Sequence, residues 1–289
     1  MNQADTTATL LFDAHLDLAW NALSFDRDLT DSIDQINARE RLLTDSPSRG
    51  NATVSFSEMR RGNVAVCLGT MIAHARPDLL SAEAQQRTSL EYRSPEAASA
   101  IAQGQLAYYR LLERAGQLRL LSTASELTSH WDCWTSSFAD GKDHALPIGL
   151  ILASHNNCRA LVPGQRQFTD QQLQLLIERG AVIGVAMDNW MLVADWQTGV
   201  SLRSQATLDH VANHIDHICQ LAGSHRHVAI GSDLDGGYGA EQSPADLDTI
   251  ADLQKIGERL QQRGYEPETI RDIFHGNWLR FFKTHLPDS

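Results

Sequence analysis

Short apolar runs that are typical of strands alternate with helical patterns along the chain, and this alternation constrains the fold more than any other feature. The predicted strands are residues 9–14, 64–72, 147–152, 181–187 and 228–232, with a weaker candidate at 118–122. The predicted helices are residues 95–117, 170–179, 207–222, 245–263 and 267–282. Alternating strands and helices indicate an α/β fold with a parallel sheet.

The number of predicted strands is small for a closed barrel. A full eightfold barrel takes about 250 residues, so a chain of 289 residues is long enough, yet only five or six strand–helix units are evident. The hydrophobic fraction of 42% is that of a globular chain with one substantial core. We therefore expect a single TIM-barrel-type domain over residues 1–289 that is internally shortened, so that the barrel is incomplete or irregular.

Side chains that can bind a metal ion follow three of the predicted strands. Residues two apart in a strand share a face, and the carboxyl ends of parallel barrel strands meet on the face where barrel enzymes build their sites. A lone His-x-Asp is more often a capped turn or a surface pair, but three such strand ends favour a metal-dependent site. These residues are His15 and Asp17, His155, and Asp233 and Asp235.

Three segments resemble the membrane dipeptidase family (renal dipeptidase-like, peptidase M19) of the amidohydrolase superfamily: residues 13–21 (DAHLDLAWN), 154–166 (SHNNCRALVPGQR) and 230–236 (IGSDLDG). Residues 25–29, 62–70 and 276–280 extend the match in the same order. The resemblance implies a TIM-barrel-type metallo-dependent hydrolase. It also implies zinc-dependent hydrolysis of small dipeptides, including those with a C-terminal D-residue, by a metal-activated hydroxide.

The resemblance also implies roles for individual residues. His15 and Asp17 would bind the first of the family's two zinc ions, and His155 would belong to the second. Asp233 would be the catalytic, proton-handling carboxylate and a further metal ligand, with Asp235 as the alternative. In the family, an arginine at the position of Arg166 contacts the carboxylate of the dipeptide, a task that suits its bidentate fork.

The chain departs from the family after the predicted strand 147–152. In the family such a strand leads into a glutamate that bridges the two metal ions, and later strands supply a substrate-facing histidine and another ligand histidine. Here only two residues separate Leu152 from His155, as though an internal segment were missing. Catalytic zinc sites normally use three protein ligands, so we expect one ion or none in this chain.

Two hypotheses of function follow from these residues. The first is a metallodipeptidase, and the second is a catalytically impaired remnant or binding protein of the same family that has lost the bridging glutamate and a ligand histidine. The number of metal ions bound per chain separates them, since about two ions support catalysis.

The formal net charge of −12 disfavours a nucleic-acid partner, which demands a basic surface. No apolar run approaches the roughly 20 residues of a membrane span, and the first residues do not resemble a secretory signal, so we expect a cytoplasmic protein without a membrane partner. A shortened sheet leaves open edges. We therefore expect either a homodimer through such an edge or a smaller barrel closed by pairing of residues 147–154 with 181–187.

Several further residues allow two interpretations. A helix over 207–222 would align His210, His214 and His217 as a metal clamp, although packing is the stronger interpretation.

The tryptophans also allow two interpretations. Trp131 and Trp134 could form a lid, but packing against a loop or an intermolecular contact is favoured. Trp20 and Trp190, just beyond strand ends, fit a pocket or the core about equally well.

The four cysteines are scattered along the chain, which indicates reduced thiols. They are Cys67, Cys133, Cys158 and Cys219.

Overall fold

Parallel strands alternate with helices around the central strand β1 (Leu11–Leu16) in a computed structural model that describes residues 9–78, 90–139, 146–151, 157–163 and 166–288. Four parallel strands pair in the order β1-β2-β6-β5, and two more pair as β7-β8. Their bounds are β2 (Val64–Gly69), β5 (Leu118–Leu120), β6 (Ile148–Ile151), β7 (Ile183–Val185) and β8 (Val228–Ile230).

The two groups of strands meet at β1 and β8, which lie next to each other. The backbone N–H of Asp233 donates to the carbonyl of His15 at 3.1 Å, and the N–H of Ser232 donates to the Asp13 carboxylate at 2.7 Å. The strands therefore form an arc in the order β5-β6-β2-β1-β8-β7, and in the described ranges no strand pairing joins the two ends of this arc.

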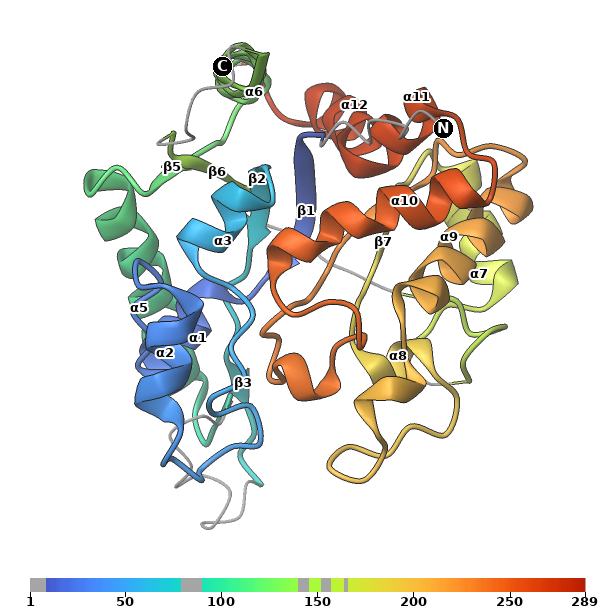
Figure 1. Cartoon of the computed structure of the whole chain (residues 1–289). Coiled ribbons are helices and arrows are strands. Elements are labelled where there is room, and N and C mark those ends of the chain that lie inside the picture. The colour runs from blue at the N-terminus through green and yellow to red at the C-terminus, as the bar shows by residue number, and fades with distance from the viewer. Residues whose placement is uncertain (1–8, 79–89, 140–145, 152–156, 164–165, 289) are drawn as a thin grey trace.

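Helices cover the arc on both sides of β1 (Figure 1). α1, α2 and α5 lie on the side of β2, and α7, α8 and α9 lie on the side of β7. The described helices are α1 (Leu18–Phe25), α2 (Ile33–Glu40), α3 (Phe56–Arg61), α5 (Pro95–Arg114), α6 (Ala124–Ala139), α7 (Asp170–Glu178), α8 (Asn189–Leu192), α9 (Leu208–Ala222), α10 (Lys255–Gln262), α11 (Pro267–Arg271) and α12 (Asn277–His285). No helix in the described part of the chain is long and apolar enough to cross a membrane.

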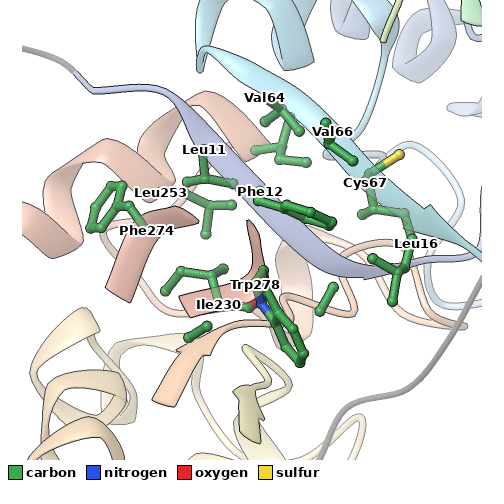
Figure 2. Packing of buried hydrophobic residues seen from close by; sticks show 14 of the residues in the cluster. Leu11, Phe12, Leu16, Val64, Val66, Cys67, Ile230, Leu253, Phe274 and Trp278 are labelled. Carbon is green, nitrogen blue, oxygen red and sulfur yellow. The ribbon is translucent and has the colours of Figure 1, made fainter. Parts of the chain in front are cut away.

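The hydrophobic core contains residues from both the start and the end of the described chain. Figure 2 shows β1 and β2 side chains packed against residues from β8 and the C-terminal helices. The ring of Phe12 stacks on Phe282 with 5.5 Å between centroids and lies 6.4 Å from the ring of Trp278. The indole N–H of Trp278 donates to the carbonyl of Ile230 at 2.9 Å, so the same side chain also fixes the end of β8.

Every predicted strand overlaps a strand of the structure, including the weak candidate at 118–122. The segment predicted to contain an aromatic lid or loop is instead helix α6, so the prediction of a loop there is wrong. Its start is capped by Thr123, whose hydroxyl accepts from the N–H of Glu126 at 3.1 Å. Trp134 on this helix is fully buried, and Trp131 is also buried.

The predicted pairing of residues 147–154 with 181–187 is also wrong for the described residues. β6 lies between β2 and β5, so it is an interior strand of the arc. The weak strand at 118–122 supplies the partner that the prediction assigned to 181–187. The ends of the arc are therefore β5 and β7, and residues 152–154 lie outside the described ranges.

Candidate metal centre

His15 and Asp17 stand at the end of β1, where the strand passes into α1. His15 lies within the strand, whereas Asp17 is the residue before the helix, with φ −87° and ψ 46°. A side chain at this position usually accepts a hydrogen bond from the first helical turn, but Asp17 makes no such bond. It accepts instead from the hydroxyl of Thr70 and lies 3.6 Å from Nε2 of His15.

Asp233 follows β8 and reaches the same point from the neighbouring strand. Its Oδ1 lies 3.4 Å from Nε2 of His15. Its backbone has φ 59°, a left-handed conformation that aspartate tolerates better than most residues. The turn then requires Gly236, because a Cβ there would lie 2.1 Å from Oδ1 of Asp233.

One ligand atom from each of His15, Asp17 and Asp233 lies within 4.8 Å of the others, and all three residues are buried. The pKa of Asp233 is raised to about 8, mainly by burial, while the charge of His15 lowers it and that of Asp17 raises it. Imidazole and carboxylate groups are both ligands of zinc in proteins, and a cation would offset the cost of burying the carboxylates. The residues therefore fit a divalent metal ion. No other group of this kind occurs among the residues that the structure describes.

A further carboxyl group near Asp233 was missed by the sequence analysis. Asp188 follows β7 and is 5% exposed. Its Oδ1 accepts from Nε2 of Gln242 at 2.8 Å. Burial, and then the charge of Asp233, raise its pKa to about 8. The signal was available, since Asp188 stands just past a predicted strand in the same way as Asp233.

The alternative to Asp233, Asp235, has a different environment. Its Oδ1 accepts from the N–H of Thr53 at 2.9 Å, and its Oδ2 accepts from the N–H of Val54 at 3.1 Å. The guanidinium of Arg27 lies 3.4 Å from Oδ2. Asp235 thus anchors a loop and does not belong to the candidate metal group, so the geometry favours Asp233 over Asp235.

The two remaining predicted site residues are His155 and Arg166. His155 lies outside the described residues. Arg166 is exposed, and its positive charge lowers the pKa of Asp233. The guanidinium is therefore close enough to act electrostatically on the candidate metal centre.

The three histidines of α9 make separate contacts. Nδ1 of His210 accepts from the N–H of Thr207 at 3.2 Å, and Nδ1 of His214 accepts from the N–H of Cys158 at 3.2 Å. His217 Nε2 lies 2.8 Å from the carboxylate of Asp170. These contacts support packing and capping over a metal clamp.

The aromatic and thiol side chains have structural surroundings. The Trp20 ring is buried and lies edge-on to Phe25 with 5.5 Å between centroids. The backbone N–H of Trp190 donates to Asp188, while its side chain is half-buried. All four cysteines are free thiols, as predicted, although Cys133 is exposed.

Comparison with known sequences gives a match of residues 147–286 to the model of the family described as Membrane dipeptidase (Peptidase family M19). An uncharacterized protein in the pqqA 5′ region of Klebsiella pneumoniae is 34% identical over 147 residues, which cover 51% of this chain and 50% of that protein. Dipeptidase aclJ of Aspergillus oryzae is 29% identical over 130 residues, covering 45% of this chain and 28% of that protein. The match thus spans half or less of these relatives.

Solved structures resemble almost the whole chain. A metallopeptidase of family M19, dipeptidase AC, has a TM-score of 0.66 at 17% identity and covers 98% of this chain and 100% of its own. A metallopeptidase from Rhodobacter sphaeroides, solved with a phosphinate mimic of the dipeptide L-Ala-D-Ala, has a TM-score of 0.67 at 18% identity and covers 96% of this chain and 99% of its own. At these identities the likeness concerns the fold, which is the α/β fold of the M19 dipeptidases.

Proposed function

Because this chain belongs, through residues 147–286, to the membrane dipeptidase family M19, we propose that it is a metal-dependent dipeptidase that hydrolyses small dipeptides. The observation that carries the proposal is the buried group of His15, Asp17 and Asp233, whose ligand atoms lie within 4.8 Å of one another. The Rhodobacter sphaeroides relative binds a mimic of L-Ala-D-Ala, so dipeptides with a C-terminal D-residue are the first substrates to test.

In the proposed site, His15, Asp17 and Asp233 would hold one zinc ion, and His155 would belong to a second. A bound zinc ion supplies Lewis acidity and lowers the pKa of water. The carboxylate of Asp233 accepts a proton at Oδ from the attacking water and passes it to the leaving amine. Arg166 binds the substrate carboxylate, since its charge reaches Asp233 and a guanidinium can grip a carboxylate through two hydrogen bonds.

A second candidate is a catalytically impaired relative that binds one metal ion and hydrolyses dipeptides poorly. It is favoured by a specific observation: the described residues supply one group of three ligands and no second group. An intact family site, as the resemblance implies, uses two ions. The two candidates share the metal group and differ in rate.

Zinc stoichiometry and hydrolysis of L-Ala-L-Ala and L-Ala-D-Ala separate the candidates. If the chain is a dipeptidase, added zinc gives turnover that His15→Ala abolishes, because that change removes a ligand from the buried group. His285→Ala is the matched control, since His285 is an exposed residue at the end of α12. Zinc bound at about one ion per chain with negligible turnover would support the impaired relative. Failure to bind zinc would contradict both candidates.

The proposal also includes one domain over residues 1–289, a cytoplasmic location and a homodimer formed through an end of the sheet. Free thiols at all four cysteines are consistent with a reducing compartment. A dimer is consistent with an arc whose described ends, β5 and β7, each pair with one strand. Cell fractionation tests the location, and light scattering tests the assembly.

A further inference from the structure

The side chain of Asn21 links the two segments that carry the candidate metal ligands. Its Nδ2 donates to the backbone carbonyl of Asp17 at 3.0 Å and to that of Asp235 at 2.7 Å. Asp17 is a candidate ligand, and Asp235 lies two residues after the ligand Asp233. One amide group, 3% exposed, therefore joins the end of β1 to the loop after β8.

A buried arginine fixes the orientation of this amide. Nη1 of Arg27 donates to Oδ1 of Asn21 at 2.8 Å, which leaves the Nδ2 group to face the two carbonyls. Arg27 is itself held by two hydrogen bonds of 2.9 Å to the carboxylate of Glu40 and by one of 3.0 Å to the carbonyl of Ser48. Because every donor and acceptor of the Asn21 amide has a partner, the rotamer of the side chain is determined by its surroundings.

We propose that Asn21 is a positioning residue that holds Asp17 and Asp233 at the spacing required for one metal ion, and that Arg27 orients it. The inference rests on the proposed function in one respect, since it requires that His15, Asp17 and Asp233 bind a metal. Residues that hold metal ligands in place without touching the ion typically change metal affinity about 10–100-fold when mutated. Loss of the bridge lets the two ligand-bearing segments separate, so affinity falls while the ligands themselves remain.

The chain contains a matched control with the same pattern of hydrogen bonds. Nδ2 of Asn277 donates to the carbonyls of His225 and Val228 at 2.7 and 2.8 Å, and Oδ1 accepts from Nη1 of Arg280 at 2.8 Å. Asn277 is also fully buried. It holds the start of β8, however, whereas the metal ligand Asp233 follows the end of that strand. A purely structural role therefore predicts equal effects at the two asparagines.

The experiment compares Asn21→Ser with Asn277→Ser in the full chain. Zinc affinity is measured by competition with a chromophoric chelator, and stability is measured by urea unfolding of the metal-free protein. We expect both variants to lose similar stability, because each loses the same set of buried hydrogen bonds. We expect Asn21→Ser alone to weaken zinc binding, by about 10–100-fold.

Arg27→Lys and Arg280→Lys form a second pair for the case that either serine variant fails to fold, and urea unfolding of each separates affinity from stability, since Arg27 also pairs with Glu40 and Asp235 and Arg280 pairs with no carboxylate in the described residues. Arg27→Lys should weaken zinc binding and Arg280→Lys should leave it unchanged. Equal zinc affinity within each folded pair would overturn the inference while leaving the proposed function intact. A wild-type chain that binds no zinc would instead contradict the proposed function, and the inference with it.

Discussion

Asp233 and Asp235 are two residues apart and both adopt left-handed backbone conformations, with φ 59° and 60°. Burial raises the pKa of both carboxyl groups. Their partners differ, since Asp233 faces His15, whereas Asp235 accepts hydrogen bonds from Thr53 and Val54. The same residue type thus has a candidate chemical role at one position and an anchoring role at the other.

Substitution by asparagine should separate these two roles. Asp233→Asn should abolish tight zinc binding and leave the metal-free protein as stable as the wild type or more so, because it removes a carboxyl group that must take up a proton to be buried at neutral pH. Asp235→Asn should cost about 1–3 kcal/mol, because an amide N–H would face the backbone donors at 53 and 54. Urea unfolding in chelator gives the stabilities. An Asp233→Asn variant that unfolds more easily than Asp235→Asn would contradict these assignments.

The raised pKa of Asp188 predicts a pH dependence of stability. The folded-state pKa is about 8 against a usual value of 3.8, so between these values the folded protein binds a proton that the unfolded chain has released. Stability therefore falls as pH rises through this window, by at most about 1.4 kcal/mol per unit for one group.

Asp188→Asn should make this dependence shallower, because the amide does not titrate and can still accept from Gln242; the slope that remains belongs to Asp233, whose pKa is also raised to about 8. The measurement is urea unfolding of the metal-free wild type and variant between about pH 7 and pH 8. In this range the buried His214 and His275, whose pKa values are lowered to about 4 by burial, stay neutral in the folded protein. Parallel pH profiles for the two proteins would show that Asp188 is already ionised in the folded state.

The candidate ligands could be found from the sequence because each follows an apolar strand. His15 and Asp17 come just after the predicted strand 9–14, and Asp233 comes just after 228–232. In the structure β1 extends to Leu16 and so includes His15, and the three side chains converge. Asp188 follows the same rule and was overlooked. The role of Asn21 could not be read from the sequence, because its partner Asp235 lies 214 residues away and buried amides have no distinctive spacing.

At the scale of elements, α6 shows how tertiary contacts decide local structure. Its sequence contains serine, threonine and tryptophan residues, which are weak helix formers, so a loop was the natural prediction. In the structure Trp134 is fully buried, and its indole N–H donates to the carbonyl of Pro147 at 3.0 Å, next to β6. Packing against the sheet therefore stabilises a helix that propensity alone does not predict.

This dependence on one buried side chain can be tested. Trp134→Ala should destabilise the protein by about 3–5 kcal/mol, the usual cost of removing a large buried aromatic group. Cys133→Ala, at the exposed neighbouring position, should change stability by less than about 0.5 kcal/mol. Denaturant unfolding followed by circular dichroism measures both. Similar stabilities for the two variants would mean that α6 does not depend on this contact.

Short helices were also absent from the prediction, as were the two-residue strands β3 (His74–Ala75) and β4 (Glu91–Tyr92). α1, α2 and α3 contain eight, eight and six residues, and helices of this length are marginal without tertiary support. The strands were easier, because apolar runs bounded by polar residues are distinctive. The strand order was harder to predict, because the pairing of β6 with the weak strand β5 depends on contacts between residues far apart in the sequence.

For the whole molecule, the two ends of the arc are partly covered by side chains. The backbone N–H of Leu120 on β5 donates to the Glu113 carboxylate at 2.9 Å. Just after β7, the N–H of Ala186 donates to Oδ1 of Asn157 at 2.8 Å, and the carbonyl of Ala186 accepts from the same amide. Capping of edge groups in this way limits uncontrolled pairing with other chains.

If the proposed homodimer uses the β5 edge, uncovering that edge should strengthen association. Glu113→Ala removes the acceptor of the Leu120 N–H and should shift the light-scattering mass from that of one chain, 32.0 kDa, toward that of two at lower protein concentration. Glu96→Ala is the control, as an exposed residue at the other end of the same helix. An unchanged mass for Glu113→Ala over all concentrations would exclude β5 as the interface.

The packing of β1 against α12 also constrains when the protein can fold during its synthesis. Phe12 is made long before Trp278 and Phe282, the rings it contacts in the core. A growing chain on the ribosome therefore carries an apolar strand whose partners have not yet been translated. Domains generally fold as units, so the core of this one closes only after residues 277–285 emerge. Until then Phe12 lacks the ring contacts that it has in the folded core.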